Sequence, residues 1–217
     1  MEMAERIKVV VVDDQNVARG FFEMHIKTSL RYELVRSLPA ADLAITYLEQ
    51  HPVDLVIMDI VMRYGMDGLS AAEQIKKRFP QVKVILVTSM AEATWEKRAK
   101  IAGIESFWYK EYSEEPLIEI MDRTMNGESV YPSDAPVVQF GKVTTQELTE
   151  RELDVLRELT SGATNEEIAQ HLFISVNTVK RHIQNLMDKS GYKNRLALAI
   201  NATSLGLVVS NEEIGKK

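Results

Sequence analysis

Two kinds of hydrophobic pattern alternate over the first 127 residues. Short, nearly continuous apolar runs are typical of strands that are buried on both faces of a sheet; they span 7–12, 33–38, 53–58, 82–87 and 105–109. Apolar residues recur at helical spacing over 16–29, 40–50, 69–79, 92–102 and 114–126. Five strand–helix pairs in succession predict an α/β domain with a doubly wound parallel sheet, whose site lies at the carboxyl ends of the strands.

The pattern changes after residue 127. Gly and Pro interrupt residues 128–145 and no period survives there, which predicts a linker between domains at 1–127 and 146–217. Ser175 is a candidate N-cap, and both Thr149-Glu-Arg-Glu152 and Thr164-Asn-Glu-Glu167 have the sequence of a capping box. The second domain is therefore expected to be all-α, with four helices near 149–161, 165–172, 176–190 and 195–205.

Composition narrows the class of protein. No run of the 217 residues approaches the roughly 18–20 apolar residues of a membrane span, and two acids, Glu2 and Glu5, stand where a secretion signal would be basic, so we expect a cytoplasmic protein. The absence of Cys excludes disulfides and thiolate metal sites, and the 4 His show no metal-ligand spacing. The net charge of -6 argues against a protein that coats nucleic acid by bulk attraction.

Charged and hydroxyl residues follow four of the predicted strands. Asp13 and Asp14 close the first, Asp59 the third, Thr88 the fourth and Lys110 the fifth. An Asp after a strand is often only a helix N-cap, but three carboxylates at one sheet edge repel each other unless a cation is present. An all-oxygen site suits Mg²⁺. Asp59 could then attack a phosphoryl donor while Thr88 and Lys110 hold the phosphoryl oxygens.

These residues resemble the receiver domain of two-component signalling from about residue 7 to residue 125. The motifs are Val11-Val-Asp-Asp14, Ile57-Met-Asp-Ile-Val-Met62, Asp67-Gly-Leu69, Val87-Thr-Ser89, and Gly103 leading through Phe107 to Lys110. The resemblance implies a flavodoxin-like fold, a sensor histidine kinase as partner, and Asp59 as phosphoacceptor. It also implies that Asp13, Asp14, Asp59 and the main chain of Val61 hold Mg²⁺, that Thr88 and Lys110 contact the phosphoryl group, and that Phe107 moves inward when Thr88 moves. Phe107 could instead be a plain core or surface aromatic.

The sequence departs from the family pattern at three places. The loop Met62-Arg-Tyr-Gly-Met-Asp-Gly68 lacks the usual Pro and is one residue longer. Glu111 follows Lys110 where many receivers have a Pro after a cis bond, and a cis non-prolyl bond costs about 2.5–4 kcal/mol. Val61 cannot hydrogen-bond an attacking water, so we expect slow loss of the phosphoryl group.

The segment 176–190 combines an apolar stripe with an opposite face that carries Asn177, Lys180, Arg181 and Gln184. Such a face is usually only solvated. Here the segment 176–190 follows a short helix and the turn 173–175, and it begins at a capped end. This order is typical of a helix-turn-helix, whose second helix enters the major groove of DNA.

The C-terminal motifs are similar to the LuxR-type domain of NarL/FixJ response regulators. They are Leu148-Thr-Glu-Arg-Glu-Leu153, Thr164-Asn-Glu-Glu-Ile-Ala169, Ile174-Ser-Val-Asn-Thr-Val-Lys180 and Asn194-Arg195. The resemblance implies DNA binding by Asn177, with Lys180, Arg181 and Gln184 at base edges and Thr164, Asn165, Thr178 and His182 near phosphates. The last helix has two apolar sides, and the side with Leu196, Ile200 and Thr203 is a candidate surface for a homodimer on DNA. The alternative is a helix that is buried on all sides within its own domain.

The leading hypothesis is a DNA-binding transcription regulator, not an enzyme, in which phosphorylation of Asp59 changes the face around 91–112. A second hypothesis treats the receiver as a phosphorylation-independent dimerisation module, because of the altered loop at 63–66. A third is a Mg²⁺-dependent phosphatase or phosphotransferase that uses Asp59 covalently; it is disfavoured because no second acid lies two residues past Asp59.

Overall fold

The computed structural model describes residues 5–62, 65–90, 93–133 and 136–208. The chain forms two compact units, made mainly by the residues up to 133 and by those from 136 on. None of the helices in these ranges is long and apolar enough to cross a membrane.

The first unit is a five-stranded parallel sheet of order β2-β1-β3-β4-β5. Its strands are β1 Ile7–Val12, β2 Tyr32–Leu38, β3 Leu55–Asp59, β4 Lys83–Thr88 and β5 Ser106–Tyr109. Its helices are α1 Asn16–Thr28, α2 Ala41–Leu48, α3 Gly68–Arg78, α4 Ala93–Ile101 and α5 Leu117–Met125. The predicted doubly wound α/β fold is confirmed.

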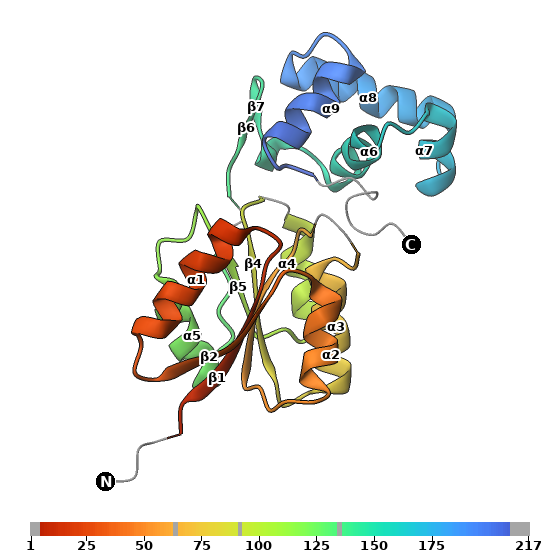
Figure 1. Cartoon of the computed structure of the whole chain (residues 1–217). Helices are drawn as coiled ribbons and strands as arrows, with labels where there is room; N and C mark the ends of the chain where they lie inside the picture. The colour runs from red at the N-terminus through yellow and green to blue at the C-terminus, as the bar shows by residue number, and fades with distance from the viewer. Residues whose placement is uncertain (1–4, 63–64, 91–92, 134–135, 209–217) are drawn as a thin grey trace. The chain divides into compact units, whose positions relative to one another are not determined.

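The helices cover both faces of the sheet, with α1 and α5 on one side and α2, α3 and α4 on the other (Figure 1). On the α1/α5 side, Val9, Ile57 and Val87 of the sheet pack with Phe22 and other apolar residues of the two helices. The strands are apolar on both faces because both faces are covered, which is why the sequence shows continuous apolar runs and no alternation.

The second unit contains α6 Glu150–Thr160, α7 Asn165–His171, α8 Val176–Ser190 and α9 Arg195–Ser204. Both expected capping boxes are present, at Thr149 and at Thr164, and Ser175 caps α8 by accepting a hydrogen bond from the Thr178 amide. The four predicted helices of the helix-turn-helix domain are confirmed.

Residues 128–133 and 136–145 contain more regular structure than the predicted linker. Val130 lies beside β5, where its carbonyl accepts a hydrogen bond from the Phe107 amide at 2.9 Å. Further on, β6 Gln139–Phe140 and β7 Val143–Thr144 form an antiparallel hairpin, followed by a 3-10 turn at Thr145–Glu147. Phe140 is fully buried in the core of the second unit and its ring meets Tyr192 edge-on. Two-residue strands carry no readable period, so the sequence pattern could not reveal this hairpin.

Candidate functional site

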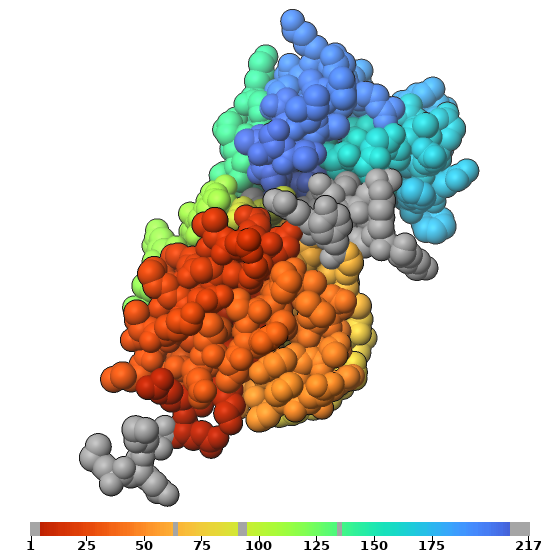
Figure 2. Space-filling view, in the orientation of Figure 1, coloured from red at the N-terminus to blue at the C-terminus, as the bar shows by residue number. Residues whose placement is uncertain are grey.

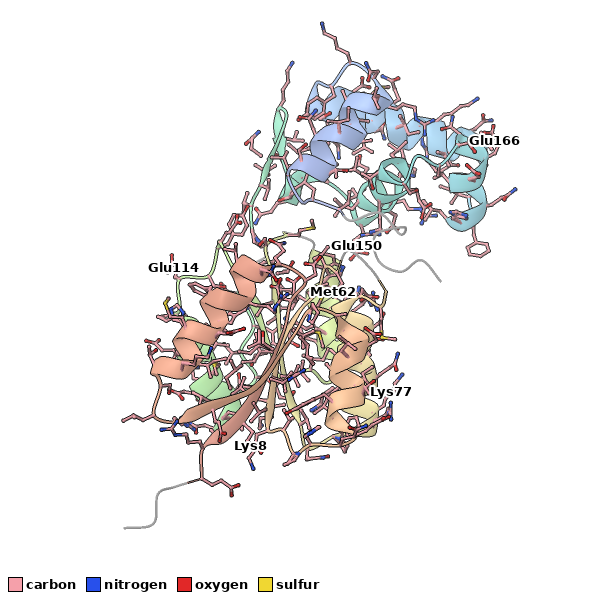
Figure 3. All side chains as sticks on the ribbon, viewed as in Figure 1. Lys8, Met62, Lys77, Glu114, Glu150 and Glu166 are labelled. Atoms are coloured by element: carbon pink, nitrogen blue, oxygen red, sulfur yellow. The ribbon has the colours of Figure 1, made fainter. Side chains whose placement is uncertain are left out.

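The predicted chemistry of the first unit gathers at the carboxyl edge of its sheet. Asp13 follows β1, Asp59 and Thr88 end β3 and β4, and Lys110 follows β5. The main chain fixes these ends, since the Lys110 amide donates to the Thr88 carbonyl at 2.8 Å and the Asp13 amide donates to the Leu38 carbonyl at 3.1 Å. In Figure 3, Met62 marks this edge, and Lys8 lies near the opposite end of β1.

Three carboxylates meet there. Asp13 and Asp59 are buried and Asp14 is half-buried, and each offers an oxygen within 4.8 Å of the others. Carboxylate oxygens in such a group are the ligands that a hard divalent cation prefers. The predicted convergence of Asp13, Asp14 and Asp59 is therefore confirmed, and the residues fit a metal ion.

Lys110 is the cation that the first unit itself brings to these acids. Its Nζ lies 2.6 Å from Asp13 Oδ2 and 2.7 Å from Asp59 Oδ1, and its side chain is largely buried. Lys110 thus pairs with two of the three carboxylates. The oxygens of the group remain ligands of the kind that a divalent cation prefers.

Burial sets the proton affinity of Asp59. It raises the pKa of the Asp59 carboxyl to about 7; the Lys110 charge opposes this rise and the Asp13 charge adds to it. Burial lowers the pKa of Lys110, but the charges of Asp59 and Asp13 outweigh it, so the net pKa of Lys110 is raised and its ammonium form is favoured. Any added cation near Asp59 favours its ionised form, which is the nucleophilic one.

The loop after β3 closes back on Asp59. The Gly68 amide donates to the Ile60 carbonyl at 2.9 Å, and Asp67 caps α3 by accepting from the Ser70 amide at 2.8 Å. A Cβ on Gly68 would lie 1.8 Å from the Asp59 carbonyl oxygen, so only glycine fits. Val61 is half-buried within this loop, and residues 63–64, part of the altered stretch 63–66, lie outside the described residues.

The last strand connects the site to α4. Phe107 is buried and its ring centroid lies 5.0 Å from that of Tyr109. The Tyr109 hydroxyl donates to Glu96 Oε1 at 2.8 Å in a buried hydrogen bond. Phe107 thus points inward, which both the switch hypothesis and the plain core hypothesis allow. No peptide bond among the described residues is cis, so the Lys110–Glu111 bond is trans.

The polar face of α8 is open to solvent in the second unit. Its exposed members are Asn177, Lys180, Arg181 and Gln184, while Val179, Ile183 and Leu186 on the other face are buried in the core. Thr178 and His182 are half-buried at the sides of that face. Gln184 donates from Nε2 to Asp188 at 2.8 Å, so its amide has an intrahelical partner.

Two cations of the second unit make contacts between helices that the sequence did not predict. Lys189 donates to Glu152 Oε2 at 2.8 Å and to the Glu147 carbonyl at 3.1 Å, and thereby ties α8 to the start of α6. Arg195 reaches across to the start of α7, where it contacts Ala163 and Asn165. Both contacts join residues far apart in the chain, so no local pattern signals them.

The two sides of α9 differ in exposure. Leu198 and Ala202 are fully buried, whereas Leu196 is 65% and Ile200 is 54% exposed, and Thr203 is exposed as well. The alternative of a helix buried all round is therefore wrong. α9, in blue, forms part of the surface of the second unit that Figure 2 shows.

Comparison with known proteins agrees with both units. Residues 9–122 match the response regulator receiver domain, and residues 146–202 match the luxR family of bacterial regulatory proteins. The response regulator protein VraR of Staphylococcus aureus is 32% identical over 207 residues, which cover 93% of this chain and 99% of VraR.

Solved structures of similar fold include two RcsB dimers bound to two parallel DNAs, with a TM-score of 0.60 and 22% identity over 93% of this chain and 100% of that chain. Another is RcsB from Salmonella enterica serovar Typhimurium bound to promoter P1flhDC in the presence of the phosphomimetic BeF3-, with a TM-score of 0.62 and 20% identity over 92% of this chain and 99% of that one. With receiver motifs at the sheet edge and luxR-family motifs on the helices, the chain belongs to the response regulators that join a receiver domain to a LuxR-type helix-turn-helix domain.

Proposed function

We propose that this protein is a transcription regulator that binds specific double-stranded DNA and is controlled by phosphorylation of Asp59. The observation that carries the proposal is the buried group of Asp13, Asp14 and Asp59 with Lys110 at the carboxyl edge of the sheet. The donor is a sensor histidine kinase or a small phosphoryl compound.

Asp59 is the nucleophile in this mechanism. A carboxylate oxygen of Asp59 forms a bond to phosphorus while the bond from phosphorus to the donor's nitrogen or oxygen breaks, and the leaving group takes a proton from solvent. Lys110, whose Nζ now lies 2.7 Å from Asp59, is placed to hold a phosphoryl oxygen, and so is the hydroxyl of Thr88 at the end of β4. Both therefore stabilise the charge that develops on the transferred group.

Asp13, Asp14, Asp59 and the main-chain carbonyl of Val61 are the residues that would hold Mg²⁺. The ion supplies positive charge that offsets the repulsion between the carboxylates and the phosphoryl oxygens. The side chain of Val61 has no hydrogen-bonding group to align a water, so the acyl phosphate is expected to hydrolyse slowly and the protein to act as a switch rather than as an enzyme.

The output is binding to DNA. The exposed side chains of Lys180, Arg181 and Gln184 suit base edges, while Asn177, Thr178 and His182 lie beside them for phosphate or base contact. Residues 146–217 carry 9 Lys and Arg against 10 Asp and Glu, and this nearly neutral charge favours binding as a homodimer. Leu196, Ile200 and Thr203 offer an exposed surface for the dimer on α9. Phosphorylation is expected to act through Thr88, Phe107 and the face around 91–112, of which 91–92 lie outside the described residues.

Replacement of the phosphoacceptor tests the first half of the proposal. Asp59→Asn should abolish acid-labile phosphate incorporation from a radiolabelled small phosphodonor, because the amide cannot serve as the nucleophile. Glu96→Gln changes a carboxylate in the same unit that is not in the pocket and serves as the matched control, which should keep its labelling. Retained stoichiometric labelling of Asp59→Asn refutes the assignment.

Gel shifts on genomic fragments test the second half. The wild-type protein should bind a subset of fragments, and beryllofluoride with Mg²⁺ should tighten that binding while EDTA reverses the change. Equal affinity with and without beryllofluoride would support instead the phosphorylation-independent dimerisation module. Binding of all fragments alike would contradict specific recognition.

A further inference from the structure

Arg195, at the start of α9, lies beside the first residues of α7. Its Nη2 donates to the Ala163 carbonyl at 2.6 Å and its Nη1 donates to Asn165 Oδ1 at 3.2 Å. The side chain is nonetheless exposed. A guanidinium group carries five N–H donors in a planar fork, so two contacts leave donors that are directed to solvent.

The charge of Arg195 is not neutralised by its neighbours. In the described part of the second unit, Arg151 and Arg157 pair with Asp154, and Lys189 pairs with Glu152. No carboxylate within the described ranges forms an ion pair with Arg195. The structural cations of this unit thus have acidic partners, while Arg195 holds a positive charge at the surface.

The hydroxyl of Thr164, which the family resemblance implies near a phosphate, is already engaged inside the protein. Its hydroxyl donates its one hydrogen to Glu167 Oε2 at 2.8 Å and accepts from the Glu167 amide at 3.3 Å. A contact from the Thr164 hydroxyl to an anion would therefore break the capping box. A donor with a spare hydrogen is better placed to meet a phosphate here.

Arg195 also determines which way the Asn165 amide faces. Because a guanidinium only donates, the atom of Asn165 that faces it must be the oxygen. The Asn165 Nδ2, with two hydrogens, is consequently turned away from Arg195 and is able to donate to an acceptor outside the protein. The two side chains together present a cation and an amide donor at one spot of the surface.

We infer that Arg195 binds a phosphodiester group of the DNA backbone, together with the Nδ2 of Asn165, which it orients. This inference rests on the proposed DNA-binding function and goes beyond it by replacing Thr164 with Arg195 as the phosphate contact. A backbone contact is blind to sequence, so Arg195 contributes affinity and register to every site and does not select bases.

The test compares the salt dependence of DNA binding by full-length variants on one fragment that the wild-type protein binds. Arg195→Ala should weaken binding about tenfold at about 0.1 M salt. It should also reduce the slope of log K against log salt by about 0.9, the value for one lost phosphate contact. The affinity for unrelated DNA should fall by a similar factor.

Two further variants separate phosphate binding from a structural role. Arg195→Gln keeps an N–H donor for the Ala163 carbonyl but removes the charge, so it should lose the same part of the salt slope as Arg195→Ala. Lys193→Ala removes an exposed cation two residues earlier that makes no hydrogen bond or ion pair with α7 among the described residues, and it should change affinity and slope less. Thermal unfolding of each variant shows whether the domain is folded.

The outcomes decide between distinct conclusions. If the wild-type protein binds DNA but Arg195→Ala and Arg195→Gln have the same salt slope as the wild type, the phosphate assignment is overturned. Arg195 would then serve only to hold the start of α7 in place. A loss in Lys193→Ala as large as in Arg195→Ala overturns it as well, because the loss would then follow net charge and not position. Failure of the wild-type protein to bind any fragment contradicts the proposed function itself.

Discussion

The acidic pocket of the first unit and the polar face of α8 are both candidate binding surfaces, yet they are built in opposite ways. Asp13, Asp59 and Lys110 are largely buried and hold one another at hydrogen-bond distance. Lys180 and Arg181 are exposed, and their position comes from the buried side of their own helix. A pocket whose buried acids are paired with one lysine loses stability when that lysine is removed, whereas an exposed face loses only its ligand.

Lys110→Ala should show the largest effect of this difference. Removal of the ammonium group leaves Asp13 and Asp59 facing each other without compensation, which is expected to lower the free energy of unfolding by about 3–5 kcal/mol when Mg²⁺ is absent. Both tryptophans, Trp95 and Trp108, are buried in the first unit, so tryptophan fluorescence during urea unfolding reports on that unit alone.

Lys180→Ala is the matched control, since it removes an exposed lysine of the other unit; its unfolding is followed by far-UV circular dichroism, because that unit contains no tryptophan. It should change stability by no more than about 0.5 kcal/mol. Addition of Mg²⁺ should reduce the loss in free energy of unfolding of Lys110→Ala, because the ion brings positive charge to the same acids. If Lys110→Ala loses little free energy of unfolding, or if Mg²⁺ does not change that loss, the lysine does not stabilise the buried carboxylates.

Gly68→Ala should have the next largest effect. Its new methyl group would overlap the Asp59 carbonyl oxygen, so the backbone has to move, at an expected cost of about 1–3 kcal/mol. The displaced Asp59 should also accept phosphate more slowly. Gly20→Ala in α1 meets nothing within 4 Å and should be neutral or stabilise the protein by up to about 1 kcal/mol. Equal stability of the two variants would mean that the loop adapts without strain.

The Lys180→Ala variant should also lose affinity for specific DNA by about tenfold, through the loss of a contact worth about 1–3 kcal/mol. Fluorescence anisotropy with a labelled fragment measures this loss, and a scrambled fragment shows how much of it is specific. If folded Lys180→Ala binds DNA as tightly as the wild type, Lys180 is not part of the DNA interface. The contrast between the buried acidic pocket and the exposed face of α8 would then be weaker.

His171 should give the smallest effect, and it depends on pH. Its hydrogen bond to Glu158, 2.8 Å from Nδ1 to Oε2, raises the pKa of the imidazole, with the Glu158 charge adding to the rise. A raised pKa means that the stabilisation is complete below the ordinary pKa of histidine and is lost as the pH rises through the raised value. His171→Ala should therefore lower the melting temperature at pH 5.5 and not at pH 9. A loss of equal size at both pH values would point to packing alone.

The sequence predicts much of this molecule because its main signals are local. Apolar runs mark the strands to within two residues, and the order of strands then brings Asp13, Asp59 and Lys110 to one edge before any coordinates are known. Contacts such as that of Arg195 with Asn165 depend on the packing of two helices and have no such signal. Thr164 shows a third case: one residue fits two predicted roles, and only the geometry of its hydroxyl shows which role uses its hydrogen.

The hairpin of β6 and β7 has a practical consequence for anyone who wishes to separate the halves of this protein. A fragment that starts at residue 146 would discard Phe140 and leave a hollow beside Tyr192 in the interior of the remainder. A fragment that starts near residue 136 retains the Phe140 side chain and should be easier to purify in monodisperse form. The fragment should begin before the hairpin, because these two short strands, although they lie in the predicted linker, contribute to the core of the second unit.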